Sequence, residues 1–196
     1  NNISICFAMK KVLKEDAPET TIKLEFTGKE NIYEIRDMVE KAIEENRQVS
    51  ESNDTDKTAK RLLRLPNWLL KAAMRFLTWM DNHGLLPKKL IKVSPFHTTC
   101  FVSNMKSLRT DYIYHHLYEF GTLGQFVGMG KEHVEPVVDG DGNITTKKIM
   151  KLGMVIDERL CDGFYYAKAI KYGTKFIENP QLLRENLDEI IKDDEI

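Results

Sequence analysis

The chain contains 196 residues, which is enough for one large domain. Hydrophobic residues make up 42% of it and charged residues 30%, and these values argue against a disordered, fibrous or disulfide-stapled protein. The formal net charge of -1 argues against a general electrostatic attraction to nucleic acid.

Cysteine usage and hydropathy restrict the cellular setting. Cys6, Cys100 and Cys161 form no CxxC pair, and no histidine cluster lies near them at metal-ligand spacing, so we expect no metal site. Free cysteines are typical of a reducing cytoplasm. No apolar run approaches the ~20 residues that a membrane-spanning helix needs. We therefore expect a cytoplasmic protein whose sequence directs neither export nor insertion into a membrane.

The N-terminal quarter predicts two strands and a helix. Residues 3–9 are a dense apolar run, typical of a buried strand, and the chain reads as a fragment that begins inside a domain. Residues 21–27 alternate between apolar and polar, as a half-buried strand does. Asn31 then precedes a helical apolar pattern that ends in the polar stretch 48–56, a predicted surface loop.

The segment from Lys57 to Arg109 is strongly basic, with eleven Lys or Arg residues against one acid, Asp81. Pro66 opens an amphipathic helix, which Gly84 and Pro87 end. We expect its apolar stripe to pack on the body of the protein or on a neighbouring subunit. Attachment to an anionic membrane surface is the less favoured alternative. The stripe consists of Trp68, Leu69, Ala72, Phe76, Trp79 and Met80.

The second half predicts a run of strands followed by helices. Strands are expected at residues 98–103, 123–131, 134–138 and 145–156, the last two joined by an Asp-Gly turn at 139–143. This turn lacks the glycine and glutamate positions of an EF-hand loop, so calcium binding is not expected.

Two helices are expected after these strands. The first spans residues 164–177, with Tyr165, Ala169, Tyr172 and Phe176 inward, and the second spans residues 181–192. The second helix belongs to an acidic C-terminal segment, residues 178–196. Strands mixed with helices at both ends predict an α+β or layered α/β sandwich.

Residues 157–163 form the densest polar cluster in an apolar context, at a junction between strand and helix. Such a junction exposes side chains at the end of a sheet and directs N–H groups toward a ligand. Three carboxylates around Arg159 are compatible with a catalytic group. A buried Asp–Arg pair that holds the turn explains the pattern equally well.

Three segments together resemble the chloramphenicol acetyltransferase-like family, which includes the catalytic domain of the 2-oxo acid dehydrogenase acyltransferases (dihydrolipoamide acyltransferases). Residues 157–163 are similar to the family's Asp-His-Arg-x-x-Asp-Gly motif, and Glu178-Asn179-Pro180 is similar to the Glu-Asn-Pro that closes the following helix. Residues 98–105 and 125–130 are similar to two of its strands. The resemblance extends in pieces from about residue 3 to residue 183. Residues 57–94 are interpreted as an inserted basic amphipathic segment, and we expect that the N-terminal part of the family fold is missing from this sequence or has been trimmed.

The resemblance implies a single domain over residues 1–196, a two-layer α/β (α+β) sandwich whose mixed sheet carries helices on one face. It also implies a homotrimer or higher assembly with the active site in a channel between subunits. In the family the motif histidine takes the proton of a thiol, coenzyme A or dihydrolipoamide, and a strand hydroxyl, here Ser103, stabilises the oxyanion. Asp162 holds the loop through an arginine pair, and Gly163 permits the turn. Asp157 and Arg159 complete the loop.

Glu158 stands where the family has its catalytic histidine. A glutamate is ordinarily a weaker base than histidine by ~2 pKa units, although a carboxylate desolvated in a channel can act as a base near neutral pH. His115 and His116 lie between the two family strands, but no Asp-Gly follows them, so we interpret them as aromatic packing or channel lining. Cys161 is interpreted as a small buried residue rather than a nucleophile.

These observations predict a coenzyme A-dependent acyltransferase with catalytic residues Glu158, Ser103 and Asp162. Its expected ligands are a small-molecule acyl donor and acceptor, with coenzyme A or acyl-CoA as substrate and no metal. The alternative is a catalytically inactive relative that binds acyl-CoA or serves as a structural subunit of a larger complex. The basic stretch suits the phosphates of coenzyme A, a partner surface or plain solvation. Neither nucleic acid nor a membrane surface is the expected partner.

Overall fold

The computed structural model describes residues 3–10, 19–48 and 66–186. Five strands form one sheet in the order β2-β1-β3-β4-β5. The strands are β1 (Ile3–Lys10), β2 (Glu19–Phe26), β3 (Cys100–Asn104), β4 (Gln125–Val138) and β5 (Ile144–Ile156).

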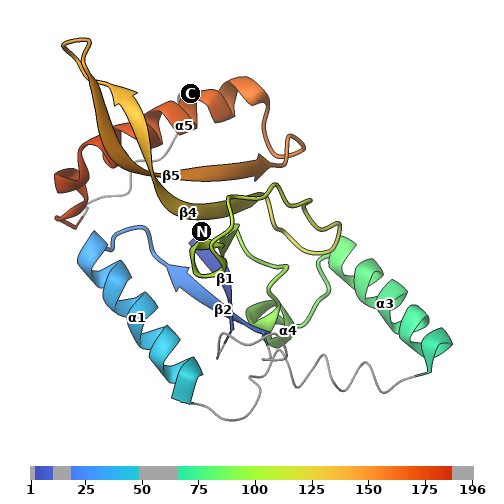
Figure 1. The fold of residues 1–196 in the computed structure, drawn as a ribbon. Coiled ribbons are helices and arrows are strands. Elements are labelled where there is room, and N and C mark those ends of the chain that lie inside the picture. Colours follow the sequence, from blue (N-terminus) through green and yellow to red (C-terminus); the bar gives the residue numbers. More distant parts are fainter. Residues whose placement is uncertain (1–2, 11–18, 49–65, 187–196) are drawn as a thin grey trace.

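The sheet is mixed, as the sequence predicts. Its three inner strands, β1, β3 and β4, run parallel, whereas β2 and β5 pair antiparallel at the two edges. Figure 1 shows helices arranged around this sheet, with α1 beside β2 and α5 beside β5. The α/β class predicted from the sequence is confirmed.

Helix α1 (Ile32–Gln48) begins where the sequence predicts. The Asn31 side-chain oxygen accepts hydrogen bonds from the backbone N–H groups of Tyr33 (2.9 Å) and Glu34 (3.0 Å). The Glu34 carboxylate in turn accepts from the Asn31 N–H at 3.0 Å, which completes a capping box. The predicted loop at 48–56 lies outside the described residues from position 49 onward.

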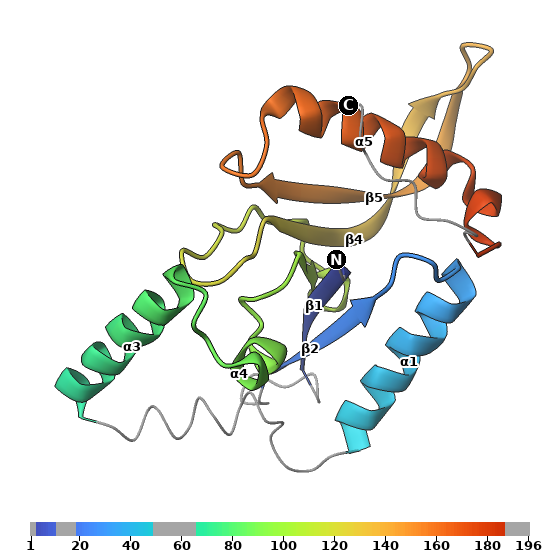
Figure 2. The ribbon, with the colours of Figure 1, turned by 180° about the vertical axis from the view of Figure 1, so that it is seen from behind.

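Helix α3 (Asn67–Asn82) also forms as predicted, with Pro66 at its N-cap, and the short helix α4 (Lys88–Val93) follows. The body of the chain does not cover the expected apolar stripe, because none of the residues of α3 is buried; packing of the stripe on a neighbouring subunit stays a prediction. Trp68 is 72% exposed and Phe76 58% exposed. Figures 1 and 2 show why: α3 lies at the periphery, away from the sheet. Its apolar periodicity indicated a covered face but could not specify what covers it.

A buried polar cluster ties the C-terminal end of α3 to the body. Asp81 accepts a hydrogen bond from the Gly121 N–H at 2.9 Å with one carboxylate oxygen, and its other oxygen contacts His97 Nε2 at 2.9 Å. The second ring nitrogen of His97 contacts the Ser94 hydroxyl at 2.8 Å.

Lys23 of β2 joins this cluster through backbone groups. It donates to the backbone carbonyls of His97 and Ile91, and burial lowers the pKa of this lysine. No sequence pattern predicted this cluster, because its members come from separate segments.

Strands β4 and β5 form a long hairpin. Strand β4 is continuous where the sequence predicted two strands, although its register with β5 shifts between Met129 and Glu132. Asp139 stabilises the turn because its carboxylate accepts the backbone N–H groups of Asp141 and Asn143. The predicted turn is therefore confirmed.

Helix α5 (Gly163–Glu178) follows β5, as predicted. Its buried residue is Tyr166, whereas Ala169 and Tyr172, two of the expected inward residues, are exposed. The predicted last helix is replaced at its start by a 3-10 turn, η2 (Pro180–Leu183), and beyond residue 186 it lies outside the described part of the chain.

The irregular segment 105–124 covers one face of β4. The Lys131 N–H donates to the Thr110 carbonyl at 2.9 Å, and Glu119 at the other end of the segment reaches Arg159. Gly128 permits this close approach, because an added Cβ would lie 2.6 Å from the Ile113 carbonyl oxygen. This covering segment, irregular apart from a 3-10 turn at Lys106–Leu108, thus connects the two ends of the sheet.

Candidate functional site

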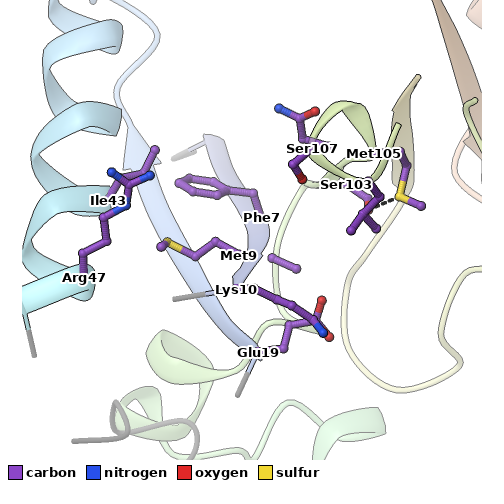
Figure 3. Close-up of a pocket in the computed structure, with 12 residues that line it drawn as sticks. Phe7, Met9, Lys10, Glu19, Ile43, Arg47, Ser103, Met105 and Ser107 are labelled. Atoms are coloured by element: carbon purple, nitrogen blue, oxygen red, sulfur yellow. Dashed lines mark hydrogen bonds between the residues drawn. The ribbon is translucent and has the colours of Figure 1, made fainter. Parts of the chain in front are cut away.

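Ser103 lies near the C-terminal end of β3, paired with Gly128 of β4. Because β1 and β3 are parallel, their C-terminal ends meet at one edge of the sheet, where α/β proteins commonly bind ligands. A hollow of about 490 Å³ opens there between β1, the end of α1, and the 3-10 turn η1 (Lys106–Leu108). We call it the Ser103 hollow; Figure 3 shows it.

The Ser103 hollow combines an apolar floor with polar groups. The Ser103 hydroxyl donates to the Met105 sulfur at 3.5 Å, and a thioether is a weak acceptor, so this hydroxyl can turn to a better acceptor at little cost. Lys10 and Arg47 bring two cations to the hollow, and Glu19 one anion. The remaining lining residues are Phe7, Ala8, Met9, Ile43, Asn104, Met105, Ser107 and Leu108. The sequence did not predict a role for Lys10 or Arg47, because only the tertiary fold brings them to Ser103.

The 157–163 loop follows directly on the C-terminal end of β5. The Asp157 carboxylate accepts hydrogen bonds from the backbone N–H of Arg159 at 3.0 Å and from its guanidinium at 2.7 Å. This guanidinium holds the pKa of Asp157 below its usual value. Arg159 also reaches Glu119 at 3.2 Å, so the Asp–Arg pair fixes the turn.

Buried Tyr166 supports the same loop from α5. Its hydroxyl donates to the Asp157 backbone carbonyl at 3.1 Å. Burial raises the pKa of Tyr166 to about 12, so the phenol stays protonated and able to donate even at alkaline pH. Helix α5 is thereby joined to the end of β5.

Asp162 and Gly163 differ from what the family resemblance implies. The Asp162 carboxylate caps α5 by accepting from the Tyr165 N–H at 2.9 Å, and the arginine of the loop pairs with Asp157 instead. Gly163 is the first residue of α5 and does not have a positive φ. A Cβ at this position would lie 3.5 Å from the Glu158 carboxylate. The turn therefore does not need glycine for its backbone conformation.

We expect Asp162→Ala to lower the free energy of unfolding by about 1 kcal/mol, because the N–H groups at the start of α5 lose their acceptor. Asp162→Ser should retain most of the stability, since serine is also a good N-cap. Chemical denaturation of the three proteins measures the difference. Equal stability of the alanine variant and the parent would contradict the capping role.

The chain does not bring Ser103 and Glu158 together. Ser103 pairs with Gly128, which pairs with Gly153. Strand β5 continues from Gly153 for three more residues, about 10 Å, and ends at Ile156, and Glu158 lies in the turn that follows. Glu158 is exposed, so within one chain no surrounding residues remove it from water. The two residues thus lie toward opposite ends of the inner part of the sheet.

His115 and His116 lie between these two ends. The His115 ring stacks on Phe126 of β4, with 4.6 Å between ring centroids, and His115 also stacks on His116 at 4.8 Å. His115 is half-buried and His116 exposed. This is aromatic packing, one of the two roles expected for them. Among the residues described, no group of three His, Cys, Asp or Glu side chains could hold a metal ion.

Residues 123–184 match the family model of the 2-oxoacid dehydrogenases acyltransferase catalytic domain. The match spans β4, β5, the 157–163 loop and α5. The predicted family resemblance is confirmed. A comparison with curated proteins finds no match.

Two solved structures show the same fold. One is a probable dihydrolipoamide acetyltransferase from Listeria monocytogenes, with a TM-score of 0.54, 13% identity and 97% of this chain covered. The other is the dihydrolipoamide acetyltransferase of Azotobacter vinelandii, with a TM-score of 0.53, 12% identity and 93% covered. The chain spans 60% and 56% of these two proteins.

Proposed function

We propose that the chain acts in a coenzyme A-dependent acyltransferase, with Ser103 as the group that stabilises the reacting carbonyl. The observation that carries this proposal is the Ser103 hollow: it holds a weakly engaged hydroxyl, an apolar floor and the cations Lys10 and Arg47. An acyl thioester of coenzyme A has matching chemistry, namely a carbonyl, an apolar chain and several phosphates.

The proposed reaction exchanges one thioester for another. Glu158 takes the proton of the attacking thiol, and the resulting thiolate forms a bond to the acyl carbon. The Ser103 hydroxyl donates to the oxyanion of the tetrahedral intermediate. The bond from carbon to the leaving sulfur then breaks, and the leaving thiolate recovers the proton. Acyl group, electrons and proton all balance without an oxidant or a metal.

The separation of Ser103 from Glu158 supports a site shared between subunits. Because one chain holds them toward opposite ends of the sheet, we propose that the 157–163 loop of one subunit faces the Ser103 hollow of the next. A closed homotrimer supplies three such sites. Burial between subunits would also remove Glu158 from water, which the single chain does not do.

A non-catalytic role in binding acyl-CoA or in assembly is the second candidate function. It is favoured by the glutamate at the position of the family histidine, and by loop groups that already serve the turn and the helix cap, Asp157 and Asp162. Calorimetric titration with coenzyme A and short acyl-CoA thioesters, followed by a thiol-release assay, separates the two. Binding with turnover supports the transferase, and binding without turnover supports the second candidate. Absence of binding would contradict both ligand-based roles.

We expect Ser103→Ala to lower thiol release by about 10²-fold, because the oxyanion loses a donor. Ser107→Ala is the matched control, since Ser107 lines the same hollow and is exposed. Acyl-CoA binding should change little in either variant. Equal loss of turnover in both variants would contradict a specific role for Ser103.

A further inference from the structure

Helix α3 presents an exposed apolar surface that the proposed acyltransferase site does not use. Four residues on its outer side, Trp68, Leu69, Phe76 and Trp79, are 72%, 36%, 58% and 50% exposed. At 100° per residue they fall within an arc of about 100°. We call this surface the α3 arc. The rings of Phe76 and Trp79 stack on each other at 6.1 Å rather than on the body.

Positive charge borders the α3 arc. Lys71 and Arg75 lie one turn apart on the side next to Trp68 and Trp79, and both are exposed. The one acid of the helix, Asp81, is held by His97 and Gly121. An anionic surface would therefore meet two cations and no free carboxylate on α3.

We propose that α3 lies in the interface of an anionic membrane, with the α3 arc facing the acyl chains. Exposed tryptophan and phenylalanine flanked by Lys and Arg are the composition of interfacial helices. No described helix is long and apolar enough to cross a bilayer, so α3 would lie along the surface. Figures 1 and 2 place α3 at the periphery, and the exposed fractions of Trp68, Phe76 and Trp79 show that the α3 arc is open to a flat surface.

The charge pattern favours a membrane over a second copy of the chain. Two α3 arcs packed against each other would bring Lys71 and Arg75 of both copies to one interface. Like charges that approach in this way weaken association. Phosphate headgroups, in contrast, neutralise both residues.

Tryptophan fluorescence tests the proposal directly, because the chain has two tryptophans and both lie on α3. We expect a blue shift of the emission when the full chain is mixed with vesicles that contain phosphatidylglycerol, and little shift with phosphatidylcholine alone. Absence of a shift with either vesicle would overturn the proposal. An emission shift or a rise in mass that depends on protein concentration without lipid would also overturn it, in favour of self-association.

Two variant pairs locate the contact. Lys71→Glu with Arg75→Glu should weaken vesicle binding about tenfold or more, whereas Lys171→Glu with Lys175→Glu on α5, also exposed, should not. Leu69→Ser with Phe76→Ser should abolish the blue shift while both tryptophans remain. Val138→Ser with Ile144→Ser, 70% and 81% exposed at the hairpin, is the apolar control. Equal effects of test and control pairs would overturn the placement on α3.

Discussion

Glu158→Gln should lower thiol release by about 10²- to 10⁴-fold, because the proposed reaction loses its general base. The amide is nearly isosteric with the carboxylate, and Glu158 is exposed, so folding should be unaffected. Turnover of the best acyl-CoA substrate measures the effect, with circular dichroism as the check on folding. Glu119→Gln is the matched control, since Glu119 belongs to the same end of the sheet and contacts Arg159.

A second variant at position 158 distinguishes a chain in which Glu158 acts as the general base from a chain that has lost its general base. Glu158→His restores the residue type that the family resemblance places there. If the parent chain binds acyl-CoA without turnover and Glu158→His gains turnover, the chain is a non-catalytic relative with its site geometry retained. If the parent is active and Glu158→Gln is equally active, Glu158 is not the base.

Asp81→Ala should lower the free energy of unfolding by about 3 kcal/mol, because it leaves the buried His97 ring and the half-buried Gly121 N–H without their partner. The Gly121 N–H and the His97 ring both bond to this carboxylate at 2.9 Å, and the His97 side chain is 3% exposed. Each buried donor left unsatisfied costs about 1–3 kcal/mol. Chemical denaturation of the full chain measures the loss.

Two controls make the Asp81 result specific. Asp81→Asn keeps an oxygen that can accept one of the two hydrogen bonds, so it should lose less stability than the alanine variant. Asp141→Ala, at an exposed position of the hairpin turn, should change the free energy of unfolding by less than about 0.5 kcal/mol. An Asp81→Ala variant as stable as Asp141→Ala would show that the buried cluster does not anchor α3.

The local sequence pattern was sufficient to predict most of the helices and strands. Alternation predicted β2, the Asn31 cap predicted the start of α1, and the Asp-Gly turn predicted the β4–β5 hairpin. These features depend on contacts between residues close in sequence or on a simple period, so the sequence carries them directly. The 157–163 motif likewise marked the loop that lies within the family match.

The sequence was a poorer guide to which helix faces are buried and to which residues far apart in the chain form pairs. The stripe on α3 indicated burial, yet α3 is exposed, because periodicity describes a helix face and not its neighbour. The same limit placed Tyr172 inward on α5, where Tyr166 is the buried residue. Asp162 was expected to pair with an arginine, and the geometry gave that role to Asp157.

Local pattern and motif spacing predicted the α/β class, most of the helices and strands, and the resemblance to the acyltransferase domain, because residues close in sequence carry that information. The packing of distant segments brings Lys10 and Arg47 to Ser103, and it separates Ser103 from Glu158 within one chain. It also decided that Asp81 pairs with His97 while the α3 arc stays exposed. These outcomes depend on how distant segments pack, and side-chain periodicity contains no record of that packing.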